Sequence, residues 1–233
     1  MRLNDYEERN DLLLDWILET TQRGCSILDV GANDGTFCYG MHRIARHAGC
    51  LAGVDPDRKM LERNPFISVR YFSTLEDAKI ASESFDILYS FFVLEHVADE
   101  ARFMEAASRV LKPGGQFFFI TPNGHHYFSI LASLFAKLGI QRRILGLVRT
   151  KELIDSYHYP AVYHLNRPKD IERIGRKYGF HQFEYRYCER FIELSTYFPG
   201  PTKVFPWLWE KMVEASRQET LLVNLMGRMI KGP

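Results

Sequence analysis

Short apolar runs alternate with helical patterns through the first half of the chain. The apolar runs lie at 26–30, 51–54, 67–72, 85–90 and 116–120. Helical patterns separate several of these runs and lie at 36–48, 57–63 and 99–111. Strands that are buried on both faces of a sheet read as continuous apolar runs, whereas half-exposed strands alternate. The pattern therefore predicts right-handed βαβ units and a parallel sheet.

The remaining segments flank this core. Residues 6–21 carry apolar side chains at helical spacing and predict a leading helix. Beyond residue 122 the alternation stops, and it resumes with a helix at 168–178, a strand near 182–188 and a last apolar strand at 220–226. We expect one domain over residues 1–233, of the α/β class, with a doubly wound sheet and helices on both faces. Its segments are a leading helix (1–24), a core (25–122), an irregular insert (123–166) and closing helices and strands (167–233).

Composition and charge narrow the class of partner. Lys and Arg number 30 against 29 Asp and Glu, so no net field favours binding to nucleic acid. The four cysteines are scattered without a Cys-x-x-Cys pair, which argues against a zinc knuckle. The N-terminus is too charged for a signal peptide, and no apolar run approaches the ~20 residues of a membrane span. We therefore expect a cytoplasmic protein.

The first strand runs into a glycine loop that contains candidate binding residues. A dinucleotide fingerprint requires three glycines, but the chain has Gly31, Asn33 and Thr36 at those positions. The pattern present is instead Asp29-x-Gly31-x-x-x-Gly35, an acid followed by a tight turn and a glycine that enters a helix. A helix N-terminus favours a carboxylate, and Asp29 suits a positive amino group. The loop therefore favours an amino-acid ligand over a nicotinamide.

A second acid, Asp55, follows the next predicted strand. A carboxylate in this place can accept two hydrogen bonds from a ribose diol. A ligand with an amino acid and a ribose is S-adenosylmethionine.

The motifs in this part of the chain resemble those of the class I S-adenosylmethionine-dependent methyltransferases, small-molecule type. The matching stretches, in the family's order and spacing, are "ILDVGANDG", "GVDPD", "SFDILYSFFVLEHV" and "LKPGGQFFFITPN". The resemblance covers residues 25–123 and implies a Rossmann-like, seven-stranded, mostly parallel sheet. It also implies S-adenosylmethionine as donor and S-adenosylhomocysteine as product. The donor-binding residues that it implies are Asp29, Gly31, Asn33, Gly35, Asp55, Pro56, Thr74, Leu75 and Ser90.

Two positions depart from the family pattern. Asn33 stands where the family has its middle glycine, and asparagine tolerates the left-handed backbone better than most residues. Thr74, followed by Leu75, stands where many members place an acid against the adenine amino group. Glu76 or Asp77 could substitute for that acid.

The end of the fourth predicted strand supplies the candidate catalytic residues Glu95 and His96. Methyl transfer is an in-line displacement, and a hydroxyl acceptor must also lose a proton. In the family this strand end lies beside the methyl group, so His96 is the candidate base. The alternative is that Glu95 and His96 brace the following helix.

A metal-assisted alternative rests on a narrower resemblance. Small-RNA 2′-O-methyltransferases and some ubiquinone-pathway O-methyltransferases bind a divalent metal through Glu-x-x-Glu-His and a later histidine. Here Phe92 stands at the first glutamate, whereas Glu95, His96 and the later His164 remain. With one ligand lost, we predict no metal site and keep His164 as a candidate catalytic residue.

The insert is rich in histidine and tyrosine and contains a basic stretch. Residues 124–151 include five Lys or Arg and no acid, which suits an anionic acceptor. The stretch begins with a helical pattern that places Tyr127, Leu131, Leu134 and Leu138 on one face. Two interpretations follow, a lid packed on the core or peripheral contact with a membrane, and we favour the lid.

The sequence thus predicts methyl transfer from S-adenosylmethionine to a small molecule, on oxygen, with natural-product, glycan or lipid-linked acceptors. The alternatives are an RNA or other nucleic-acid methyltransferase, a non-catalytic protein that binds S-adenosylmethionine, and a nicotinamide oxidoreductase.

Overall fold

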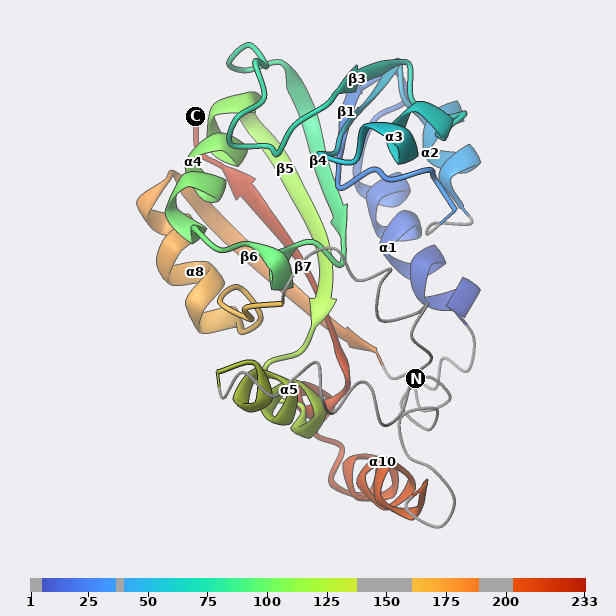
Figure 1. The fold of residues 1–233 in the computed structure, drawn as a ribbon, viewed down its shortest axis with the longest axis vertical. Helices are drawn as coiled ribbons and strands as arrows, with labels where there is room; N and C mark the ends of the chain where they lie inside the picture. The colour runs from blue at the N-terminus through green and yellow to red at the C-terminus, as the bar shows by residue number, and fades with distance from the viewer. Residues whose placement is uncertain (1–5, 37–39, 138–160, 189–202) are drawn as a thin grey trace.

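One seven-stranded sheet organises the computed structural model, which describes residues 6–36, 40–137, 161–188 and 203–233 (Figure 1). The strands are β1 (Ser26–Val30), β2 (Cys50–Val54), β3 (Val69–Tyr71), β4 (Phe85–Phe91), β5 (Leu111–Pro122), β6 (Phe180–Cys188) and β7 (Asn224–Lys231). Their order in the sheet is β3-β2-β1-β4-β5-β7-β6. Strand β7 runs antiparallel to both neighbours, and the pairs from β3 to β5 are parallel. The predicted α/β fold with a mostly parallel sheet is confirmed.

Helices cover both faces of the sheet. The α-helices are α1 (Tyr6–Thr20), α2 (Met41–His47), α3 (Arg58–Arg63), α4 (Glu100–Val110), α5 (Tyr127–Lys137), α8 (Pro168–Lys177) and α10 (Val204–Ser216). Within the described ranges, short 3-10 helices form at η1 (Leu94–His96) and η3 (Glu219–Leu221). Buried residues of α1, α2 and α3 form one core cluster, and those of α4 and α8 form the other.

Strand β5 shows how the sequence divides the two cores. Phe117, Phe118 and Phe119 are all fully buried, because this central strand is covered on both sides. Phe118 belongs to the cluster under α1 and meets Trp16 edge to face at 5.7 Å, whereas Phe117 and Phe119 belong to the cluster under α4 and α8. The period-2 alternation of a strand therefore sends successive aromatic rings to opposite layers.

Three predicted elements differ clearly in their bounds from those observed, and the strand predicted at 116–120 is the longer β5, which begins at Leu111. The helix predicted over 36–48 is α2, which begins only at Met41, because Asp34 accepts hydrogen bonds from the backbone and hydroxyl of Thr36 and holds a turn after Gly35. The strand predicted at 220–226 begins at Asn224. The Asn123 side chain donates to the carbonyls of Thr220 and Leu222 at 2.8 and 2.7 Å, and so keeps these residues out of the ladder.

The carboxyl edge of the parallel strands is where binding residues gather in folds of this type. Helix α5 follows the end of β5, and α10 with η3 precedes β7, so both helices lie at this edge (Figure 1). Among the described residues, no helix is long and apolar enough to cross a membrane.

Candidate functional site

The glycine loop that follows β1 adopts the conformation its sequence requires. Gly31, Asn33 and Gly35 all have positive φ angles, of 78°, 44° and 81°. Glycine adopts this region without a steric penalty, and asparagine is one of the few other residues that visit it. A methyl group on Gly31 would overlap the Val93 side chain, so the loop lies directly against the segment that leads into η1.

A buried asparagine that the sequence analysis did not predict supports this loop through hydrogen bonds to its backbone. The Asn64 side chain is fully buried and donates to the carbonyls of Ala32 and Asn33 at 2.9 and 3.2 Å. Its Oδ1 accepts from the Phe66 backbone N–H at 3.1 Å, which fixes the amide. In the sequence Asn64 precedes Pro65 and reads as an ordinary turn residue, so nothing local distinguishes it.

Asp55 joins the end of β2 to the same loop. Its carboxylate accepts from the backbone N–H of Asn33 at 2.9 Å and of Asp57 at 2.8 Å. Burial raises the pKa of Asp55, and these two hydrogen bonds counteract part of the rise. Pro56 beside it is exposed. The remaining lone pairs of the carboxylate leave room for the predicted bonds to a ribose.

Asp29, the acid at the end of β1, is 4% exposed. Tyr89 on β4 donates a hydrogen bond from its hydroxyl to Asp29 Oδ2 at 2.8 Å. Burial raises the pKa of Asp29 to about 7, the hydrogen bond from Tyr89 lowers it, and the charge of Asp55 raises it further. An ionised carboxylate at this depth requires a positive partner, as the amino group of an amino acid provides.

Ser90 adds a hydroxyl to this edge of the sheet. It follows Tyr89 on β4, pairs with Val30 of β1 and is fully buried. Within the described part of the chain its Oγ has no hydrogen-bond partner. Buried hydroxyls normally have partners, so an orphaned one beside a glycine loop fits a site that completes its hydrogen bonds with a ligand. The loop, Asp29, Asp55 and Ser90 together fit S-adenosylmethionine.

Thr74 and Leu75, the two residues predicted beside the adenine, differ from each other in burial. Thr74 is exposed, and its hydroxyl donates to Asp77 at 3.3 Å. Leu75 is 2% exposed and belongs to the core under α4, so only its backbone can face a ligand.

Glu95 lies in a buried hydrogen-bond network. The Thr121 hydroxyl donates to Glu95 Oε2 at 3.1 Å, and Asn166 Nδ2 donates to the same hydroxyl at 2.6 Å. The Glu95 carbonyl accepts from the backbone N–H groups of Val162 and Tyr163. This network ties η1 to β5 and to the segment before α8, which favours a bracing role for Glu95. Thr121 and Asn166 were not singled out by the sequence.

His96 is the last residue of η1 and directly follows Glu95, whose hydrogen-bond network braces this segment. Its backbone N–H donates to the Val93 carbonyl at 2.9 Å, its side chain is half-buried and Nδ1 is buried. The brace therefore fixes the backbone that carries the candidate base.

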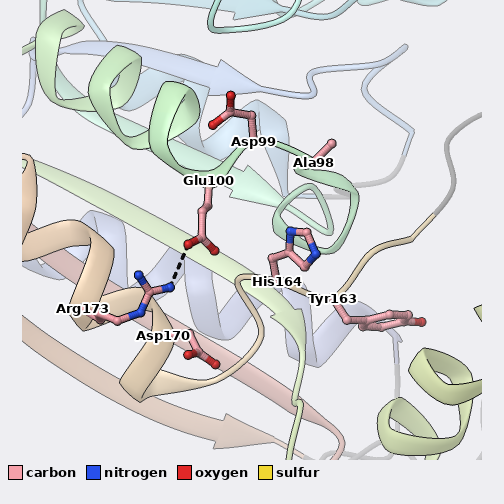
Figure 2. Close-up of a pocket in the computed structure, with 7 residues that line it drawn as sticks. All are labelled: Ala98, Asp99, Glu100, Tyr163, His164, Asp170 and Arg173. Atoms are coloured by element: carbon pink, nitrogen blue, oxygen red, sulfur yellow. Dashed lines mark hydrogen bonds and ion pairs between the residues drawn. The ribbon is translucent and has the colours of Figure 1, made fainter. Parts of the chain in front are cut away.

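His164 is exposed and lines an open hollow with Asp99, Glu100 and Arg173, beside the ion pair between Glu100 and Arg173 (2.7 Å) (Figure 2). The chain does return to Glu95 at Tyr163, but the His164 side chain faces this hollow. Phe92, at the place of the missing glutamate, has φ 55° and packs against the core under α1. Among the described residues no three His, Cys, Asp or Glu side chains group as metal ligands.

Helix α5 is turned differently from the prediction. The predicted inward face includes Leu131 and Leu134, which are 41% and 48% exposed, whereas His126 and Ser129 are buried. Of the predicted face, Tyr127 does pack edge to face against Trp209 of α10 at 4.9 Å, and His126 before it meets the same ring at 5.5 Å, so contact with α10 holds the start of α5. Leu138 and the basic residues Arg142, Arg143, Arg149 and Lys151 lie outside the described residues.

Comparison with known proteins identifies relatives of this arrangement. A family model described as a methyltransferase domain matches residues 4–184. A ubiquinone biosynthesis O-methyltransferase of Aromatoleum aromaticum is 32% identical over 76% of this chain and 73% of its own. An arsenite methyltransferase of Aquipseudomonas alcaligenes is 26% identical over 67% of this chain. The chain spans 44% of that relative's length, and 39% and 50% of two others.

A solved structure shares the fold. Phosphoethanolamine N-methyltransferase 2 of Haemonchus contortus, in complex with S-adenosyl-L-methionine, superposes with a TM-score of 0.60 at 15% identity. The superposition covers 97% of this chain and 53% of that one.

Proposed function

Because this chain belongs to the family of S-adenosylmethionine-dependent methyltransferases, we propose that it transfers a methyl group to an oxygen atom of a small-molecule acceptor. The observation that carries the donor half of the proposal is the buried acid at the end of β1. Asp29 is enclosed next to a left-handed glycine loop, which suits an ammonium group, and the neighbouring strand end carries a buried Ser90 hydroxyl without a hydrogen-bond partner among the described residues.

The donor supplies a methyl group on a positively charged sulfur. The chain's own contribution is to bind and orient. Asp29 receives the ammonium, Asp55 accepts from the ribose hydroxyls, and the Gly31 to Gly35 loop allows close backbone approach. Holding the reactants in line contributes much of the rate in a displacement of this kind.

His96 is the proposed base for the acceptor hydroxyl. Since Nδ1 is buried, Nε2 is the ring nitrogen that takes the proton. The network of Glu95, Thr121 and Asn166 keeps η1 in place, and so sets the direction from which the imidazole approaches. Glu95 therefore acts in positioning His96, and His164 lies away from the base, in the hollow beside Glu100 and Arg173.

An oxygen acceptor is supported by the Aromatoleum aromaticum relative, which matches 76% of this chain and is named as an O-methyltransferase. The acceptor would enter at the carboxyl edge, where α5 and α10 lie (Figure 1). A hollow lined by Tyr127, Phe205, Leu208, Trp209 and Met212 offers apolar surface there. An acceptor that combines a ring or hydrocarbon part with a hydroxyl matches these surroundings.

Donor binding is the first prediction. S-adenosylhomocysteine should bind in a calorimetric titration, and NADH should not. Asp55→Ala should weaken S-adenosylhomocysteine binding by a factor of about 30, because it removes the ribose contacts and the bonds that hold Asn33 and Asp57. Unchanged affinity in this variant would refute the ribose assignment, and binding of NADH alone would refute the methyltransferase proposal.

Catalysis gives the second prediction. Radiolabelled donor and a panel of phenols, amines and carboxylates identify the acceptor, and a phenol is expected. With it, His96→Gln should lower kcat about a hundredfold with donor affinity unchanged. His181→Gln serves as the control, since His181 is exposed at the start of β6, at the opposite edge of the sheet. Full turnover in His96→Gln would remove the base assignment, and methylation of amines alone would remove the oxygen assignment.

A further inference from the structure

We infer that Tyr89 is a positioning residue of the donor site, whose hydroxyl fixes the Asp29 carboxylate in the orientation that receives the donor's ammonium group. This inference rests on the proposed function. It concerns a residue that the donor does not need to touch, since Tyr89 acts through Asp29.

The geometry begins with the pairing of two strands. Strands β1 and β4 are parallel neighbours, and Asp29 and Tyr89 are register partners. Paired residues project from the same side of a sheet, so the phenol and the carboxylate meet in the layer under α1. The hydroxyl lies 2.8 Å from Oδ2, in a fully buried environment.

The phenol is itself held in place by packing. Tyr89 is 0% exposed and meets Phe91 edge to face, with 5.7 Å between ring centroids and 78° between planes. A side chain with only two rotatable bonds in such a cluster has little freedom to follow the carboxylate. Asp29 therefore adjusts to Tyr89, and Oδ2 is occupied while Oδ1 remains available for the ammonium.

The hydrogen bond also favours the ionised carboxylate. Among the described residues, the charged and titratable groups that act on Asp29 are Tyr89 from β4 and Asp55 from β2. Burial and the negative charge of Asp55 raise the pKa of Asp29, and the Tyr89 hydroxyl opposes them. Without that hydroxyl the pKa rises further, so a larger share of Asp29 is neutral near pH 7 and cannot pair with the ammonium.

The test is Tyr89→Phe, which keeps the ring and its packing. S-adenosylhomocysteine affinity is measured calorimetrically for wild type and variant across about pH 6 to 9, and the ratio of the two dissociation constants is followed. Titration of the ligand cancels in this ratio. We expect the ratio to be about ten times larger at the acidic end, because the variant ionises Asp29 about one pH unit later. A ratio that does not change with pH would overturn the inference.

Two further variants separate this mechanism from a structural effect. In the Asp29→Asn background, Tyr89→Phe should cause no further change in affinity, since the group through which it acts is gone. An equal loss in both backgrounds would contradict the inference. Tyr185→Phe, which loses a 3.3 Å bond to the Pro168 carbonyl at the other edge of the sheet, should leave binding unchanged. Wild-type protein that fails to bind S-adenosylhomocysteine would refute the proposed function instead.

Discussion

Asp29→Asn is expected to weaken donor binding several hundredfold, to an affinity that is still measurable at high ligand concentration, and at the same time to stabilise the ligand-free protein at neutral pH. Loss of the negative charge that would pair with a buried ammonium corresponds to about 3–5 kcal/mol, or a factor of several hundred or more in affinity. Both effects have the same cause, because Asp29 is a carboxylate held where a charge is unfavourable. A buried carboxylate of this kind lowers the free energy of unfolding, but it is retained because it binds the ligand.

The stability effect has a defined sign. In the folded protein the pKa of Asp29 is raised from 3.8 to about 7. Between these values the folded state holds a proton that the unfolded state has released, so the contribution of Asp29 favours folding below about pH 4 and is lost as the pH rises through 7. Replacement by asparagine removes this loss. We expect the variant to exceed wild type by roughly 2–4 kcal/mol at pH 8 and by much less at pH 5.

Urea unfolding at these two pH values, together with calorimetric titration, measures both parts of the prediction. Asp86→Asn is the matched control, because Asp86 lies on the neighbouring strand but pairs with Lys112 at 2.8 Å, and its pKa is lowered. That variant should keep donor affinity and gain no stability. An Asp29→Asn protein that binds S-adenosylhomocysteine normally, or that is less stable than wild type at pH 8, would contradict the assignment.

Local patterns in the sequence indicate much of the proposed donor site. The acid, the spacing of Gly31 and Gly35, and the second acid Asp55 all lie at the ends of strands that the apolar runs mark clearly. Asn33 is correctly predicted to tolerate a left-handed backbone, since this depends on the residue itself. These features are short-range, and for that reason a single sequence reveals them.

The contacts that complete the site join distant parts of the chain. Tyr89 reaches Asp29 across 60 residues through a strand register that no local pattern encodes, and Asn166 reaches Thr121 across 45 residues from the segment before α8. Within an apolar run, Tyr89 reads as one more core residue. The placement of α5 is unpredictable for the same reason, because Trp209, which holds its start, belongs to a helix near the other end of the chain.

His126, at the start of α5, should make the acceptor side of the protein sensitive to acid. Its Nδ1 accepts from the Phe128 backbone N–H at 3.2 Å, so the neutral ring carries its proton on Nε2. The ring is fully buried, and among the described residues Nε2 has no hydrogen-bond partner. Burial lowers the pKa of His126 from 6.5 to about 3.

The sign is opposite to that of Asp29. Between pH 6.5 and about 3 the unfolded state binds a proton that the folded state excludes, so the contribution of His126 is present above 6.5 and is lost as the pH falls. The loss approaches about 1.4 kcal/mol per pH unit. As the pH falls through the same range, the contribution of Asp29 to the free energy of unfolding increases while that of His126 decreases. The two changes partly cancel in the wild-type stability curve, and only a comparison with variants at each pH separates them.

His126→Asn removes the titration and keeps an oxygen that can accept from Phe128. It is expected to cost stability at pH 7.5, where a buried ring is lost, but to recover about 2 kcal/mol relative to wild type by pH 5. His125→Asn, at the exposed neighbouring histidine, should show no such dependence. Urea unfolding measures the difference, and amide exchange in α5 shows whether the loss is local.

If the stability curves of wild type and His126→Asn run parallel with pH, then the ring can accept a proton in place, and α5 stays on α10 in acid. If they converge as expected, acid loosens α5 over the same pH range in which protonation of Asp29 weakens donor binding. Two buried groups, His126 near the proposed acceptor hollow and Asp29 in the proposed donor site, then restrict activity to neutral and higher pH.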